Sequence, residues 1–329
     1  MSEPVGLGLV GCGRAVEKLY VPALRAVSDA RVVGVTDVNV ERRALIAEQL
    51  PEARAHESLE QMLEDSAIEA VVIATPPGTH ADVARQALRA ERWALIEKPL
   101  AETLEQGLSL GELGEEATRR IMLGYNRRFW TPMRRLRETI AASNGAPPAQ
   151  ASIVFSINAE DWGAVAGRVD PLDDLASHYL DLLRFVFDAE LAAVAAQRPH
   201  ARAVRLKVRL SNGVEAEMHH EHGEWTQEHF RVQWDGRAFE ARMGSSRIQP
   251  AAGPVRTLLD RMDQVARKLR GRGWTLGRSY VEQVETFARC VRRDESPVPG
   301  YTDGLAGLRG LDAARRSADT QGEEVSIDA

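Results

Sequence analysis

The regular alternation of strand-like and helix-like sequence through the first 125 residues constrains the fold of this chain more than any other feature. Short apolar runs rich in β-branched residues alternate with segments of helical periodicity, such as 41–50 and 81–91. The apolar runs cover residues 5–11, 31–37, 70–75, 93–97 and 121–125. Strands that alternate with helices pair in parallel through right-handed crossovers. This half of the chain therefore predicts a doubly wound parallel sheet of the α/β class.

The pattern changes after residue 126, where strands are expected to follow one another directly. In order, the predicted elements are a helix, a strand, a helix and a series of strands, at residues 130–142, 151–157, 171–187 and 190–244. Two turns in that series, Asn212-Gly213 and Asp235-Gly236, have the residue pairs that favour tight β-hairpins. We therefore expect a second α/β domain with an open, mostly antiparallel sheet.

The chain length of 329 residues is enough for two domains, which we place at 1–124 and 125–329. Three further helices are expected near the C-terminus, followed by a short polar tail; the helices lie near 255–270, 279–293 and 302–317.

The charge and the cysteine content exclude some classes of protein. The formal net charge of −6 argues against nucleic acid as the main partner. The first residues have no basic segment typical of a signal peptide, and no apolar run is long enough to span a membrane. Cys12 and Cys290 are too far apart in sequence to suggest a metal knuckle. A reducing cytoplasm is the simplest expected location.

A glycine-containing turn follows the first predicted strand. Gly11 and Gly13 occupy the positions that a dinucleotide-binding Rossmann turn needs, one for the tight bend and one for close approach of the pyrophosphate to backbone amides at a helix N-terminus. The third position of that motif, usually glycine or alanine, is Val16, which weakens the match. Alone, a plain tight turn explains this segment equally well.

The second predicted strand ends in Asp37, where an acidic residue accepts hydrogen bonds from the adenosine ribose hydroxyls. A carboxylate at this place repels a 2′-phosphate, so the sequence favours NAD over NADP. Arg42 and Arg43 lie a few residues later and are the argument for NADP, because a guanidinium that reaches the 2′-phosphate would bind it. The preferred interpretation places both on a solvated helix face.

Further motifs occur in order along the chain. They are the run Ala74 to His80 (ATPPGTH), Glu97-Lys98-Pro99, Gly124 to Phe129 (GYNRRF), Asp174 to Asp181 (DLASHYLD) and residues 303–318. With the glycine turn and Asp37, this ordered set resembles the motifs of the glucose-fructose oxidoreductase and inositol dehydrogenase family (Gfo/Idh/MocA). The resemblance covers nearly the whole chain.

The resemblance implies a nicotinamide-dependent enzyme that acts on a carbinol carbon of a sugar, a cyclitol or a related compound. It implies a Rossmann domain followed by an α/β domain whose sheet often mediates homodimers or homotetramers. Lys98 corresponds to the family's active-site lysine, and Asp174 and His178 to its acid-base pair. The residues that match the cofactor-binding positions are Gly11, Cys12, Gly13, Arg14, Ala15, Asp37, Thr75, Pro76, His80, Glu97 and Lys98.

The chemistry of a dehydrogenase needs these residue types. A base of near-neutral pKa must take the hydroxyl proton, and a cation must stabilise the developing oxygen charge. Asp174 and His178 are four residues apart on a predicted helix and share a face, so the carboxylate can orient the imidazole. Pro99 holds Lys98 extended at the carboxyl edge of the sheet, where substrates bind in such folds. Asp181 is either a second orienting carboxylate or, in the favoured interpretation, a structural one.

Four residues are candidates for substrate contact: Asn126 and Arg128 in the GYNRRF motif, and Trp162 and Arg168 before the predicted helix. For Trp162 and Arg168, a structural role that holds the loop before this helix in place is an equal alternative. The segment before that helix departs from the family pattern, because it lacks a glycine-rich run, and Ala176 stands where glycine is usual. The identity of the substrate therefore cannot be carried over from any family member.

Two other features have a structural interpretation. His219, His220, His222 and His229 crowd two neighbouring strands, but no further ligands complete a metal site, so no metal is expected. The segment 254–274 is basic and amphipathic, and packing on its own domain or on a subunit is favoured over a membrane surface.

The sequence thus favours an NAD(P)-dependent dehydrogenase or reductase acting on CH–OH groups. Two alternatives remain open. One is a glycosidase of the same family that retains its NAD, and the other is a cofactor-binding regulatory protein without turnover.

Overall fold

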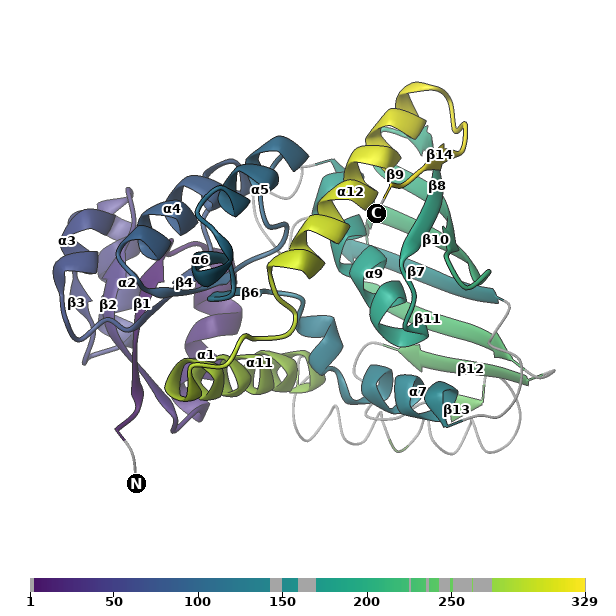
Figure 1. The fold of residues 1–329 in the computed structure, drawn as a ribbon. Helices are drawn as coiled ribbons and strands as arrows, with labels where there is room; N and C mark the ends of the chain where they lie inside the picture. The colour runs from purple at the N-terminus through teal and green to yellow at the C-terminus, as the bar shows by residue number, and fades with distance from the viewer. Residues whose placement is uncertain are drawn as a thin grey trace. The chain divides into compact units, whose positions relative to one another are not determined.

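The computed structural model describes residues 3–142, 150–158, 170–224, 226–234, 237–242, 249–250 and 274–328, together with Met262. The chain forms two compact units (Figure 1). The first consists of residues 1–126 and 280–308, and the second of residues 127–279 and 309–329. Each unit is built around its own sheet.

The first unit contains a six-stranded sheet in the order β3-β2-β1-β4-β5-β6, in which every pair is parallel. The strands are β1 (Val5–Val10), β2 (Ala30–Thr36), β3 (Arg54–Ala55), β4 (Ala70–Ile73), β5 (Trp93–Ile96) and β6 (Ile121–Leu123). The five predicted strands are confirmed. The sixth, β3, was not predicted, because it is two exposed residues long and has no apolar run.

Helices connect these strands and cover both faces of the sheet, as parallel pairing requires. They are η1 (Val16–Tyr20, a π-helix), α1 (Val21–Ala26), α2 (Val40–Gln49), α3 (Leu59–Glu64), α4 (Pro77–Arg89), α5 (Leu104–Gly111) and α6 (Glu115–Thr118). Helix α4 contacts α3, α5 and α6 on one face. Fully buried aliphatic residues such as Ile73, Ile96 and Leu123 form the core beneath them.

The chain returns to the first unit after passing through the second. Helix α11 (Trp274–Arg293) enters this unit at Tyr280, whose ring meets the edge of Tyr20 with centroids 5.1 Å apart. Helix α12 (Tyr301–Asp319) adds Leu305 and Leu308 to the core of this unit. The predicted division at residue 124 does not include this return, because helical periodicity does not reveal which sheet a helix covers.

The second unit contains an eight-stranded sheet in the order β13-β12-β11-β7-β10-β9-β8-β14. The strands are β7 (Gln150–Asn158), β8 (Leu191–His200), β9 (Ala203–Leu210), β10 (Glu215–Gly223), β11 (Gln227–Trp234), β12 (Arg237–Arg242), β13 (Gln249–Pro250) and β14 (Val325–Ser326). Only β7 and β10 pair in parallel. The open, mostly antiparallel sheet is therefore confirmed.

The turns and the last strand of this sheet can be compared with the sequence-based expectations. The Asn212-Gly213 turn joins β9 to β10, and Gly213 has the positive φ of 86° that this turn requires. Residues 235–236 lie outside the described residues, although β11 and β12 pair as an antiparallel hairpin. The short polar tail that was predicted after the last helix contains β14, which pairs with β8 and extends the sheet.

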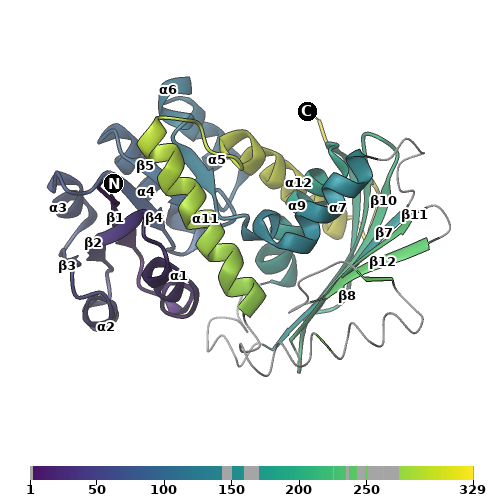
Figure 2. The same ribbon diagram turned by 90° about the horizontal axis from the view of Figure 1, so that it is seen from below.

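Helices lie on one face of this sheet (Figure 2). Helix α7 (Thr131–Ala141) contacts α9 (Pro171–Phe187), and α9 packs across β9 and β10. The other face carries alternating charges in the described strands, with Lys207 opposite Glu217 and Arg209 opposite Glu215. Among the described residues, no helix is long and apolar enough to cross a membrane.

Candidate active site

The glycine turn follows β1 and is formed by two glycines with different surroundings. Gly11 has φ of 93°, and a Cβ atom there would lie 2.6 Å from the carbonyl oxygen of Ala74. A Cβ atom at Gly13 would meet nothing within 4 Å, and this residue is exposed. Close packing thus explains Gly11, whereas Gly13 borders open space at the start of a helix. This arrangement fits a pyrophosphate that approaches backbone amides.

The helix that begins in this turn has an unusual first segment. Its turn at 16–20 is a π-helix, and the amide of Val21 donates to the carbonyl of Val16. Pro22 follows directly and lacks the amide hydrogen that a regular helix would use. The widened turn holds Val16 fully buried and directs Tyr20 into the core. The unexpected residue at the third motif position is therefore compatible with the bend.

Asp37 at the end of β2 is bonded to the same turn. Its carboxylate accepts hydrogen bonds from the amide of Cys12 at 2.5 Å and from the amide of Asn39 at 2.7 Å. A carboxylate has about four lone-pair directions, so these two bonds leave room for ribose hydroxyls. Burial, followed by the Asp37 charge, raises the pKa of the Cys12 thiol to about 12.

The two arginines of α2 do not lie on a solvated helix face, contrary to the sequence-based interpretation. The Arg42 side chain donates to the carbonyl of Cys12 at 2.8 Å and forms an ion pair with Glu17 at 2.8 Å. Arg43 donates to the carbonyl of Asp37 at 3.2 Å. Both guanidinium groups therefore bind the backbone of the predicted cofactor loops.

The loop after β4 is tied to the loop after β5 by His80. Its ring nitrogens lie 2.7 Å from the carbonyl oxygen of Pro99 and 2.8 Å from that of Thr75, and the residue is buried. Burial lowers the pKa of this imidazole, although the two carbonyls act in the opposite direction. With both nitrogens engaged by backbone, His80 holds the loop of Pro76 against the loop of Lys98.

Glu97 and Lys98 follow β5 at the same edge of the sheet. The buried Glu97 carboxylate accepts from the Tyr20 hydroxyl at 2.7 Å and from the Lys98 amide at 3.1 Å. Burial, then the Glu97 charge, raise the pKa of Tyr20 well above its ordinary value, which keeps the hydroxyl a donor. The Lys98-Pro99 peptide bond is cis, and Lys98 is half-buried. Tyr20, which no sequence motif marks, thus links the helix after the glycine turn to the loop that carries Lys98.

Helix α9 in the second unit carries the predicted acid-base pair. Asp170 caps the helix through the Leu172 amide at 2.8 Å, and Pro171 follows as predicted. Asp174 lies in the first turn, and His178 lies one turn later with 8% of its surface exposed. Their spacing of four residues puts them on one side of the helix.

Asp181, one turn further along, has a structural partner, as the favoured interpretation expected. It accepts from Arg128 at 2.8 and 2.5 Å in a buried bidentate ion pair. Arg128 is thus engaged within its own unit rather than free for substrate. The neighbouring Arg127 forms a second buried ion pair with Glu228 at 2.8 Å, which the sequence could not reveal. Asn126 is fully buried.

The four crowded histidines divide between the faces of the second sheet. His219 lies 3.5 Å from Glu221, and His229 contacts Glu240 at 3.0 Å, both on the charged face. His220 and His222 are buried on the helix-covered face. Within the described part of the chain, no group of three or more His, Cys, Asp or Glu side chains is arranged to hold a metal ion.

Some predicted residues cannot be placed. Trp162 and Arg168 lie outside the described residues, as does the segment 254–274 apart from Met262 and Trp274.

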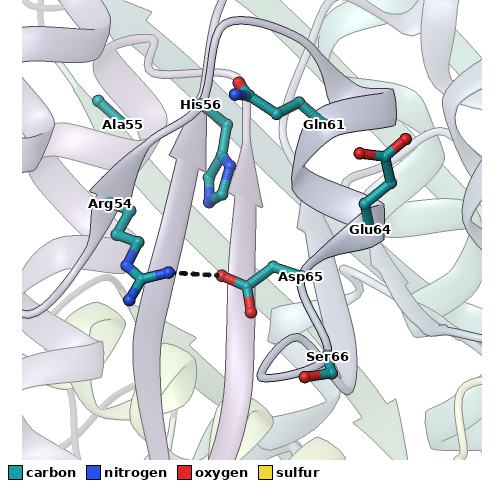
Figure 3. A pocket seen from close by; sticks show the side chains of 7 residues that line it. All are labelled: Arg54, Ala55, His56, Gln61, Glu64, Asp65 and Ser66. Carbon is teal, nitrogen blue, oxygen red and sulfur yellow. Dashed lines mark ion pairs between the residues drawn. The ribbon is translucent and has the colours of Figure 1, made fainter.

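An open pocket of about 490 Å³ lies elsewhere in the first unit, between β3 and α3 (Figure 3). Arg54 and Asp65 form an ion pair across it at 3.6 Å, and none of the predicted site residues lines it.

Comparison with known proteins shows which proteins this chain is similar to. Residues 5–125 match the family model described as "Oxidoreductase family, NAD-binding Rossmann fold". The chain is 26% identical to D-xylose 1-dehydrogenase (NADP(+)) 2 of Haloferax volcanii, over 98% of this chain and 99% of that protein. It is 24% identical to inositol 2-dehydrogenase of Rhizobium meliloti, with the same coverage of 98% and 99%.

A solved structure shares the fold of the whole chain. The WlbA dehydrogenase from Bordetella pertussis, in complex with NADH and UDP-GlcNAcA, superimposes with a TM-score of 0.81 at 20% identity, over 100% of this chain and 99% of that one. Both the Rossmann sheet and the second, mostly antiparallel sheet are therefore common to the two proteins. Residues 5–125 therefore resemble the NAD-binding Rossmann domain of the Gfo/Idh/MocA oxidoreductases, and two relatives that align with nearly the whole chain are named dehydrogenases.

Proposed function

We propose that this protein is an NAD(P)-dependent oxidoreductase that transfers a hydride between nicotinamide and a secondary alcohol or ketone of a sugar, a cyclitol or a related small molecule. The observation that carries the proposal is the arrangement of one sheet edge. Gly11, Asp37, Thr75 and Lys98 follow four neighbouring parallel strands, and ligands bind at this edge in doubly wound folds. The dehydrogenase names of full-length relatives support the same reaction class.

The residues of the chain supply binding, polarisation and proton transfer. The amides that follow Gly13 bind the pyrophosphate of the dinucleotide, and Asp37 binds its ribose. When bound, the nicotinamide ring supplies the hydride acceptor or donor. His178 exchanges the proton of the substrate hydroxyl, and Asp174 orients the imidazole and stabilises its protonated form. Lys98 stabilises the negative charge that develops on the same oxygen.

The contacts of Arg42 support NAD as the preferred cofactor. This guanidinium is neutralised by Glu17 and bonded to the backbone of Cys12, so it is not available to bind a 2′-phosphate. Asp37 adds a negative charge at the place where that phosphate would lie. The relative from Haloferax volcanii is named as NADP-dependent, so the preference must be measured in this chain.

The cofactor proposal is tested by kinetics with NAD and NADP in parallel, for the wild type and for Glu17→Gln. We expect higher kcat/KM with NAD in the wild type. The variant should gain activity with NADP, because Arg42 loses its counterion. Full wild-type activity with NADP alone would refute the role given to Asp37.

The catalytic proposal is tested with a panel of sugars, cyclitols and their keto forms, assayed by nicotinamide absorbance. With the best substrate, Lys98→Met should lower kcat by about 100-fold or more and leave the Kd for NAD unchanged. Arg89→Met is the control, because Arg89 is an exposed cation in the last turn of α4. Near-normal turnover of Lys98→Met would contradict the proposal. Sugar release without net NADH formation would instead identify an NAD-retaining glycosidase.

We also propose that the protein forms a homodimer or homotetramer through the charged face of the second sheet. Support comes from the described part of that face, where no helix covers the strands. Light scattering after size exclusion should give a multiple of 36.2 kDa, and charge reversal at Arg205 and Lys207 should lower it. A monomer at micromolar concentration would contradict this assembly.

A further inference from the structure

Strand β10 presents two histidines to the helix-covered face of its sheet. Side chains alternate along a strand, so Met218, His220 and His222 share this buried face, whereas Glu221 points to the charged face. Helix α9, which carries Asp174 in its first turn, packs across the same strand. The predicted catalytic helix therefore lies against a row that contains two imidazoles.

His222 contacts the carboxylate of Asp174. Its Nε2 atom lies 3.4 Å from Asp174 Oδ2, and the two side chains are 4% and 26% exposed. A contact at this depth is screened by solvent much less than a surface pair. Ile157 is the paired residue of His222 on β7, and the His222 amide donates to the carbonyl of Arg202. Asp174 is the acidic side chain found at ion-pair distance from this imidazole among the described residues.

His220 provides an internal comparison on the same strand. It is fully buried, and its ring lies 5.1 Å from the Tyr179 ring and 6.5 Å from the Phe155 ring. Within the described residues, neither ring nitrogen has a hydrogen-bond partner. Burial lowers the pKa of His220 to about 3, so this imidazole stays neutral near neutral pH. It acts as an aromatic packing residue. The Nε2 atom of His222 also has no hydrogen-bond partner among the described residues, but it lies at ion-pair distance from a carboxylate.

We propose that His222 is a positioning residue that holds the Asp174 carboxylate in place and in its ionised form. The proposal rests on the proposed function, in which Asp174 orients His178. A carboxylate in the first turn of a helix can rotate about its side-chain bonds. The imidazole that lies 3.4 Å from one oxygen restricts this rotation. In this arrangement His222 on the sheet positions Asp174, and Asp174 orients His178 on the same helix.

The first test measures the contact without any substrate. The full-length protein is labelled with 13C at histidine Cε1, and the His222 resonance, assigned with His222→Gln, is recorded by NMR. In Asp174→Asn, the chemical shift of this resonance should change, because the imidazole loses the carboxylate that lies 3.4 Å from its Nε2 atom. An unchanged His222 resonance would overturn the proposal, whatever reaction the enzyme catalyses.

The second test compares the same substitution at two buried positions. His222→Leu should lower kcat by about 10- to 100-fold with little change in KM or in the Kd for NAD, because misplacement of a catalytic group affects the chemical step. His220→Leu should retain wild-type kcat. His222→Gln keeps a side-chain N–H group at similar reach, so it should recover most of the turnover. This variant tests the proposal even if His222→Leu does not fold.

The outcomes separate this inference from the proposed function. If Asp174→Asn abolishes turnover while His222→Leu and His222→Gln both match the wild type, the positioning role is wrong and the proposed function stands. If Asp174→Asn keeps full turnover, the acid-base assignment itself fails. Equal losses in His222→Leu and His220→Leu would show that burial alone matters and would also overturn the proposal.

Discussion

Replacement of His220 by leucine should make the second unit more resistant to acid. The imidazole is fully buried, and its pKa is lowered by burial from 6.5 to about 3. The unfolded chain binds a proton at this residue below about pH 6.5, whereas the folded chain does not until about pH 3. The unfolded state therefore binds more protons in this window, and the free energy of unfolding falls as the pH drops.

The size of the effect follows from the same shift. One pKa unit corresponds to about 1.4 kcal/mol, so His220 should cost the folded state about 2 kcal/mol at pH 5 and almost nothing at pH 7. Leucine has no titrating group and a similar volume. It also removes an imidazole whose nitrogens have no partner among the described residues, which adds a pH-independent gain of about 1–3 kcal/mol.

The assay is urea unfolding of the wild type and His220→Leu at several pH values from 7 to 5, followed by circular dichroism. The stability difference between the two proteins should widen by about 2 kcal/mol as the pH falls from 7 to 5. All other acidic and basic groups are common to both proteins, so they cancel in this comparison. A constant difference across this range would refute the burial of a neutral imidazole.

Three further predictions concern the first unit. Gly11→Ala should destabilise the first unit by about 1–3 kcal/mol, because the new Cβ atom meets the Ala74 carbonyl and Gly11 has a positive φ. Thermal unfolding and NAD titration check this prediction. An unchanged melting temperature and an unchanged Kd for NAD would contradict it. Tyr20→Phe should cost about 1–3 kcal/mol, measured by urea unfolding, because the buried Glu97 carboxylate loses a donor. The raised pKa of Cys12, about 12, predicts that iodoacetamide at pH 8 leaves this thiol unmodified until the protein is unfolded. Mass spectrometry of the Cys12 peptide shows the difference, and rapid labelling of the folded protein would be the contrary result.

Local sequence patterns were sufficient to predict most elements. The apolar runs that became β1, β2, β4, β5 and β6 are long and fully or largely buried, so hydrophobic periodicity marks them. Helix α9 was predicted within its observed bounds because Asp170 and Pro171 form a strong N-terminal signal. Strand β3 carries no such signal, and its place at the sheet edge depends on pairing with β2.

The candidate site was predictable only where its residues belong to local motifs. The glycine turn, Asp37 and Lys98 each end a strand, so their common edge follows from the parallel topology. The partners of these residues come from distant segments and leave no pattern. Tyr20 binds Glu97 and Gln283, Arg128 binds Asp181, and His222 contacts Asp174.

The proposed hydride transfer is tested most directly by following the hydrogen itself. The best substrate of the panel is prepared with deuterium on its carbinol carbon and incubated with the enzyme and NAD, and the reduced cofactor is examined by mass spectrometry. We expect one deuterium on the nicotinamide ring for each ketone formed, and loss of this transfer in Lys98→Met. Product formation without deuterium in the cofactor would contradict it.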